Sequence, residues 1–179
     1  MARAFRPRCA AVGGGTLRIP QSLQGSYGVL LIYRRAWCPY CQAQLAGFQR
    51  ASDKLAETGI KVVALSVDDE ATTRELVAKH GLTFPVGHSA DARAISEATG
   101  AFVNEDPLYL QSTGFVLGPD GRVIVSVYSS GAIGRLVPRG RRRHGPLHPG
   151  ARGRRQLSAG RYASPFGRPS RARRRRSRP

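Results

Sequence analysis

Two cysteines separated by two residues constrain this chain more than any other feature of its sequence. Cys38 and Cys41 lie in the segment Trp-Cys-Pro-Tyr-Cys at positions 37–41. An uninterrupted apolar run, residues 28–33, precedes the segment, and apolar residues at helical spacing follow it over 41–55. The pattern predicts a buried strand that passes directly into a helix, with both thiols at the junction. Thiols placed in this way are typical of a site for reversible disulfide chemistry.

The rest of the chain alternates between strand and helix patterns. A turn sequence at 118–121, Gly-Pro-Asp-Gly, separates two β-branched runs and predicts an antiparallel hairpin. Residues 101–112 are expected to be irregular. The expected elements, in chain order, are an edge strand at 16–19, strand 28–33, helix 39–57, strand 61–67, helix 70–80, an extended piece at 84–86, helix 91–99 and strands 113–117 and 122–128. This order predicts an α/β fold with a mixed central sheet.

The net charge of +18 belongs to the two ends of the chain and not to its middle. Residues 139–179 contain fifteen Arg, no Lys and no acidic residue, whereas residues 18–138 hold eleven basic and eleven acidic residues. We therefore expect a neutral folded domain at 16–138, a flexible N-terminal arm at 1–15 and a disordered Arg/Gly/Pro-rich tail at 139–179.

Three interpretations of the tail after Pro138 remain open. It is an arm that binds nucleic acid through its positive charge, a solvated tail without a partner, or the product of a shifted reading frame. Arg, Gly, Pro and Ala are encoded by codons whose first two bases are each G or C. A GC-rich gene read out of frame therefore yields this mixture of residues. The first interpretation supplies the alternative function: a nucleic-acid-binding protein whose folded domain is redox-inert.

The cysteine content and the hydropathy exclude several classes of protein. Three cysteines are too few for a secreted disulfide framework, and Cys9 is left without a partner in the expected arm. A structural zinc site needs four ligands, and beyond the pair only Cys9, His80 and His88 are candidates. No apolar run reaches the roughly 18 residues of a membrane span. The N-terminal residues are basic but have no apolar core, so we expect no signal peptide. We expect a cytoplasmic protein with no membrane partner, no metal and no cofactor.

Residues 16–137 resemble the thioredoxin-like superfamily, whose WCxxC motif the WCPYC segment matches. The strand sequence Val-Val-Ala-Leu-Ser-Val-Asp-Asp at 62–69 and the hairpin turn at 118–121 are similar to the peroxiredoxin-like (AhpC/TSA, redoxin) branch. The resemblance implies a thioredoxin-like three-layer fold and a thiol-dependent antioxidant oxidoreductase. Such folds usually close with an amphipathic helix after the hairpin. Here Pro138 interrupts that pattern, so the closing helix is expected to be missing.

The chain departs from this resemblance at two places. Typical peroxiredoxins carry PxxxTxxC, and counted back from Cys38 the Pro and Thr are replaced by Leu31 and Arg35. Typical thioredoxins place a cis-Pro at the start of the hairpin strand, where this chain has Thr113. The substrate is therefore left open between a peroxide and a protein disulfide, with an external thiol reductant as the second partner.

The position of each thiol predicts its role. Cys38 precedes the helix, where free backbone N–H groups stabilise a thiolate, so it is expected to attack. Cys41 lies one turn into the helix, so it is expected to be less exposed and to resolve the mixed disulfide. Asp68 and Asp69 are expected to cap the following helix, and the alternative for Asp68 is that it assists proton transfer at Cys41. The predicted supporting residues are Trp37, Pro39, Tyr40 and Thr113, and Tyr109 and Gln111 are further candidates for the site lining.

Overall fold

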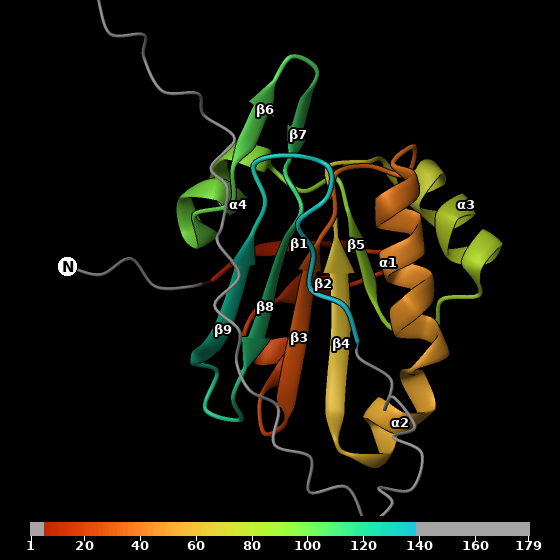
Figure 1. The fold of residues 1–179 in the computed structure, drawn as a ribbon, viewed down its shortest axis with the longest axis vertical. Coiled ribbons are helices and arrows are strands. Elements are labelled where there is room, and N and C mark those ends of the chain that lie inside the picture. The colour runs from red at the N-terminus through yellow and green to blue at the C-terminus, as the bar shows by residue number, and fades with distance from the viewer. Residues whose placement is uncertain (1–5, 139–179) are drawn as a thin grey trace, which may run out of the picture. The chain divides into compact units, whose positions relative to one another are not determined.

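A seven-stranded mixed sheet organises the computed structural model, which describes residues 6–138 (Figure 1). The strand order is β2-β1-β5-β4-β3-β8-β9, in which β3, β4 and β5 are parallel and the remaining pairs are antiparallel. The strands are β1 (Arg8–Ala11), β2 (Thr16–Arg18), β3 (Tyr27–Ile32), β4 (Ile60–Leu65), β5 (Val86–His88), β6 (Val103–Glu105), β7 (Leu108–Leu110), β8 (Thr113–Leu117) and β9 (Val123–Tyr128). The helices are the 3-10 turn η1 (Gln21–Leu23), α1 (Pro39–Arg50), α2 (Ser52–Glu57), α3 (Glu70–His80) and α4 (Ala92–Thr99).

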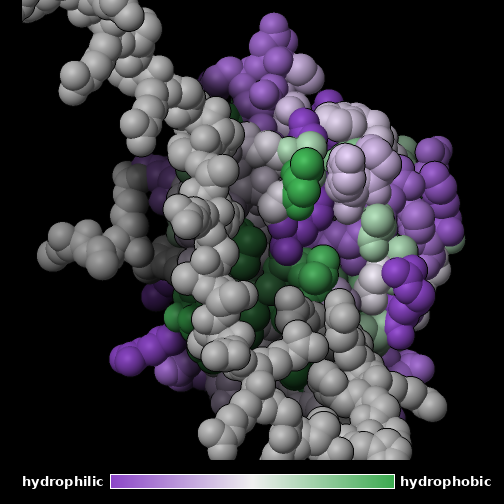
Figure 2. All heavy atoms as spheres, in the orientation of Figure 1, coloured by the Kyte–Doolittle hydropathy of each residue, from purple (hydrophilic) through white to green (hydrophobic). Residues whose placement is uncertain are grey.

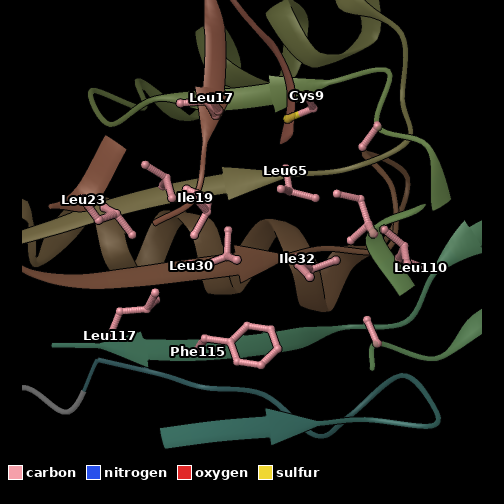
Figure 3. Close-up of a cluster of buried hydrophobic side chains, with 14 of the residues drawn as sticks. Cys9, Leu17, Ile19, Leu23, Leu30, Ile32, Leu65, Leu110, Phe115 and Leu117 are labelled. Carbon is pink, nitrogen blue, oxygen red and sulfur yellow. The ribbon is translucent and has the colours of Figure 1, made fainter. Parts of the chain in front are cut away.

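The two central strands, β3 and β4, are buried on both faces, which is why their sequences are continuous apolar runs. Alternate residues enter two separate cores. Leu30 and Ile32 join Phe115 of β8 in the first core (Figure 3). Val29 and Leu31 pack with α1 and α3 in the second core. The predicted α/β class with a mixed sheet is confirmed. Each fully buried Leu or Ile of these strands stabilises the fold by about 1.5–3 kcal/mol.

The helices α1, α3 and α4 each begin at a side chain that accepts a hydrogen bond from a backbone amide. Asp69 caps α3 by accepting from the Thr72 amide at 2.7 Å, and Asp91 caps α4. The prediction of a single helix at 39–57 is wrong, because the segment divides into α1 and α2 at Ala51. The Ala51 amide donates to the Phe48 carbonyl three residues earlier, which tightens the last turn of α1 and ends the helix.

Two segments expected to lack regular structure contain strands. Within the expected flexible arm at 1–15, Arg8–Ala11 form β1, which pairs with both β2 and β5. The side chain of Cys9 is buried in the first core together with Leu17, and this burial stabilises the short strand. Within residues 101–112, β6 and β7 form a second, two-stranded sheet in which Val103 pairs with Leu110.

The hairpin of β8 and β9 is confirmed, and residues 129–138 after it form no helix. This segment instead crosses the sheet in an irregular path (cyan in Figure 1), and Leu136 packs against the second core. Val123, Ile124 and Val125 on β9 remain 40–57% exposed. Figure 2 shows apolar, green residues over the strands on this side, beside the hydrophilic surface near α3.

The Arg-rich tail and the hypotheses attached to it lie outside the described residues. Nucleic-acid binding, the shifted reading frame and the expected disorder all concern residues 139–179. Among the described helices, none has both the length and the apolar character that crossing a membrane requires.

Candidate active site

The sulfur of Cys38 occupies the N-terminus of α1. Cys38 is the N-cap residue, with an extended backbone, and its Sγ accepts a hydrogen bond from the Cys41 amide at 3.3 Å. Pro39 takes the first helical position, where its missing N–H costs nothing and its fixed φ suits the helix. The free amides and the dipole of α1 are therefore directed at Cys38, as its position in the sequence predicts.

Cys41 lies one turn into α1. The expectation that it is less exposed than Cys38 is wrong, because each of the two cysteines is 1% exposed. Its Sγ accepts a hydrogen bond from the backbone amide of Arg34 at 3.3 Å. Burial, followed by the hydrogen bond that its thiol makes to Cys38, raises the pKa of Cys41 to about 11. Cys41 is therefore held as a neutral thiol next to Cys38 at neutral pH, which is the state expected of a resolving cysteine.

Arg135 is the contact that sequence reasoning missed. Its Nη2 donates to the Cys38 Sγ at 3.4 Å and to the Ala132 carbonyl at 2.9 Å, and its Nη1 donates to Ser112 Oγ at 2.6 Å. Nothing in the sequence marks it, because it follows the hairpin and lies 97 positions from Cys38. Its half-buried guanidinium is fixed against the sulfur from the segment after the hairpin, where such folds usually carry a closing helix.

The surroundings favour the thiolate form of Cys38. Burial raises its pKa, but the hydrogen bonds from Cys41 and the positive charges of Arg135 and Arg34 outweigh that effect. The net result is that the pKa of Cys38 lies below the ordinary value of a thiol. The two cysteines thus have pKa values displaced in opposite directions.

Asp68 fixes the loop before the cysteines. Its carboxylate accepts from the Ala36 amide at 2.7 Å and from Ser66 Oγ at 3.1 Å, and it pairs with Arg35 Nε at 3.0 Å. Of the two residues expected to cap α3, Asp69 is confirmed and Asp68 is wrong. The carboxylate of Asp68 therefore contacts the loop at residues 35 and 36 and the side chain of Ser66, and none of these contacts is with Cys41.

Aromatic side chains form the outer part of the site. Trp37 and Tyr109 pack edge to face at 5.7 Å between ring centroids, and the Arg34 guanidinium lies 4.9 Å from each ring. Arg34 Nη2 also donates to Tyr109 Oη at 2.7 Å. Trp37 and Tyr40 are 53% and 52% exposed. The predicted Trp37 therefore joins Tyr109 of β7, whereas Tyr40 faces solvent.

Thr113 is buried at the start of β8, opposite Ile32 of β3. Its Oγ1 donates to the Gln111 carbonyl at 3.2 Å, and it is the neighbouring Ser112 that contacts Arg135. Gln111 is also buried. Within residues 6–138, no three His, Cys, Asp or Glu side chains gather where a metal ion could be held.

Comparison with curated proteins finds relatives in two groups of thiol enzymes. The chain is 26% identical over 127 residues to a protein named peroxiredoxin from Treponema denticola, which covers 68% of this chain and 60% of the relative. It is 34% identical over 62 residues to thiol-disulfide oxidoreductase ResA from Oceanobacillus iheyensis, covering 34% of this chain and 32% of the relative. The chain thus spans at most 60% of the length of these two relatives.

Solved structures with the same fold include peroxidoxin BcpB from Mycobacterium tuberculosis, with a TM-score of 0.63 at 19% identity. That match covers 73% of this chain and 85% of the solved chain. The bacterioferritin comigratory protein of Xanthomonas campestris matches with a TM-score of 0.60 at 20% identity, over 69% of this chain and 79% of that one. The model of the AhpC/TSA family matches residues 5–126, which is more than half of the chain. Two thiols at the start of α1, on a thioredoxin-like sheet that this family model covers, place the chain in the AhpC/TSA family.

Proposed function

We propose that this protein is a thiol–disulfide oxidoreductase of the peroxiredoxin-like type, with Cys38 as its nucleophile and Cys41 as its resolving thiol. One observation carries the proposal: the Cys38 sulfur accepts hydrogen bonds from the Cys41 amide and from Arg135, while the Cys41 sulfur lies one helical turn away. The names of the relatives, peroxiredoxin and thiol-disulfide oxidoreductase, support the same chemistry.

The reaction with a disulfide proceeds by two exchanges. The Cys38 thiolate attacks one substrate sulfur, so that a mixed disulfide forms, the substrate S–S bond breaks and a thiolate leaves. Cys41 then gives its proton to the thiolate that has left and attacks the Cys38 sulfur, forming the Cys38–Cys41 disulfide and releasing the second substrate thiolate. The substrate is reduced by two electrons and the protein is oxidised by two. An external thiol reductant restores the two protein thiols.

Disulfides fit this site better than peroxides do. The position where the family resemblance places a peroxide-activating Thr holds Arg35, whose Nε is paired with Asp68 at 3.0 Å. That position therefore presents no hydroxyl group to a peroxide, and its guanidinium is directed at a carboxylate. The adjacency of Cys41 to Cys38, in contrast, suits rapid closure of an intramolecular disulfide.

A single-turnover assay tests the proposal. The fully reduced protein is mixed with bis(hydroxyethyl) disulfide or with hydrogen peroxide, and the loss of protein thiols is followed over time. We expect two thiols to be consumed per chain, with the disulfide reacting to completion. Cys38→Ser should abolish the reaction, whereas Cys41→Ser should accumulate a mixed disulfide that mass spectrometry detects on Cys38.

Cys9→Ser is the matched control, because Cys9 is buried in the first core and has no part in the reaction. It should consume the same two thiols as the wild-type protein. Full turnover by Cys38→Ser would overturn the assignment of the nucleophile. Consumption of peroxide but not of the disulfide would overturn the preferred substrate class.

A further inference from the structure

Arg34 is held at the edge of the active site by two aromatic rings. Its guanidinium lies 4.9 Å from the centroids of both Trp37 and Tyr109, and its Nη2 donates to Tyr109 Oη. Stacking of this kind fixes a guanidinium in place while leaving its charge intact. The backbone of the same residue donates to Cys41 Sγ, so Arg34 is anchored beside the reacting pair.

The charge of Arg34 is not neutralised by a carboxylate. The ion pairs among residues 6–138 that involve an Arg use Arg35, Arg74, Arg93 and Arg122. The contrast with the adjacent Arg35 is direct, because Arg35 pairs with Asp68 at 3.0 Å. Arg135 also lacks a carboxylate partner, but it makes four hydrogen bonds, to Gln44, Ser112, Cys38 and the Ala132 carbonyl. Arg34 is therefore the cation beside the pair that is best placed to bind a ligand.

The burial of the nucleophile limits the size of that ligand. Cys38 is 1% exposed, so the group that carries a substrate sulfur to it has to be small. Arg34 is partly exposed, and its positive charge lowers the pKa of Cys38, which places it near enough to meet a group next to the substrate sulfur atoms.

We propose that the site selects low-molecular-weight disulfides that carry a carboxylate near the sulfur, and that Arg34 is the residue that determines this selectivity. The inference rests on the proposed function and refines its substrate. The carboxylate pairs with the Arg34 guanidinium, a geometry that suits two parallel N–H···O hydrogen bonds. The reaction is the two-step exchange described above, in which one small disulfide becomes two thiols and the protein pair becomes a disulfide.

Three small disulfides of similar size and different charge test this inference. Dithiodipropionate is anionic, bis(hydroxyethyl) disulfide is neutral and cystamine is cationic. Each is mixed in excess with the reduced protein at low ionic strength, and the second-order rate of thiol loss is measured. We expect the order anionic, neutral, cationic, with the anionic probe about tenfold faster than the neutral one once their intrinsic rates with a free thiol are divided out. Added salt should reduce the differences between the three rates, because the Debye length falls to about 3 Å at 1 M salt and the charge of Arg34 is then screened.

The Arg34→Gln variant separates selectivity from general reactivity. It should lower the ratio of the anionic to the neutral rate by about fivefold. A change in the reactivity of Cys38 alters both rates equally and therefore leaves this ratio unchanged. Tyr109→Phe keeps the ring and removes the hydrogen bond to Arg34, so it should lower the ratio by less. Arg50→Gln, at the exposed end of α1, is the matched control for net charge and should leave the ratio unchanged.

The outcomes distinguish this inference from the function on which it rests. If the wild-type protein reduces none of the three probes, the proposed function fails. If it reduces all three but the corrected rates are equal, or if Arg34→Gln and Arg50→Gln change the ratio alike, the function stands and the selectivity is refuted.

Discussion

Replacing Arg135 by Met should raise the pKa of Cys38 and lower its reactivity at neutral pH. The variant removes a positive charge whose Nη2 lies 3.4 Å from the sulfur, while it keeps most of the side-chain length. Two unit charges at this distance attract by about 5 kcal/mol at an effective dielectric constant of about 20. Desolvation and the partial exposure of Arg135 reduce that attraction. A net value of about 2 kcal/mol, typical of a hydrogen bond to a charged group, corresponds to about 30-fold in the ratio of thiolate to thiol.

The ultraviolet absorbance of the thiolate, recorded against pH, measures this effect directly. Burial raises the pKa values of Cys9 and Cys41 to about 11, so the first titration step belongs to Cys38. In Arg135→Met that step should move to higher pH, and alkylation by iodoacetamide at neutral pH should slow in proportion. Arg135→Lys keeps the charge and should recover most of the shift. An unchanged first step in the Met variant would refute the role of the guanidinium.

Two further predictions concern the first core. The raised pKa of Cys9 means that the folded state favours the neutral thiol: its contribution to stability is complete below pH 9 and is lost as the pH rises towards about 11. Chemical denaturation at several pH values measures this effect. Between pH 9 and pH 11 the free energy of unfolding of Cys9→Ala should fall by about 1–2 kcal/mol less than that of the wild-type protein. An identical fall in both proteins would contradict the prediction. Gly87→Ala should cost about 1–3 kcal/mol, because its methyl group would overlap Cys9 Sγ and lie 3.1 Å from Leu17 Cδ1. In a Cys9→Ala background the cost should shrink, and equal costs in both backgrounds would show that the overlap is not the cause.

The parts of the fold that the sequence predicted are those fixed by local patterns. The strands expected at 28–33 and 61–67 were predictable because both faces of β3 and β4 are buried, which gives continuous apolar runs at 28–33 and 62–65. The two ends of α4 depend only on neighbouring residues. The Asp91 carboxylate accepts from the free amides of the first turn, and Gly100 adopts the left-handed conformation that ends the helix. The thiol pair at the start of α1 was predictable on the same grounds.

The parts that were not predicted depend on contacts between distant residues. Arg8–Ala11 has no alternation strong enough to mark a strand, and it becomes one because β2 and β5 lie on either side of it. Asp68 looked like a helix cap from its neighbours, but its partner Ala36 is 32 positions away. Arg135 could not be distinguished from the other arginines near the tail until the fold brought it to Cys38.

The hydrogen bonds around Cys38 also bear on the electrochemistry of the pair. Each group that stabilises the Cys38 thiolate, the α1 amide and Arg135 among them, stabilises the reduced protein and leaves its disulfide without the same support. The reduction potential therefore rises, by about 40 mV for a contribution of about 2 kcal/mol from Arg135. A pair with a raised potential is a weaker reductant that accepts electrons readily. The same arginine that speeds the attack on a substrate thus lowers the driving force of that step and favours the re-reduction that ends each cycle.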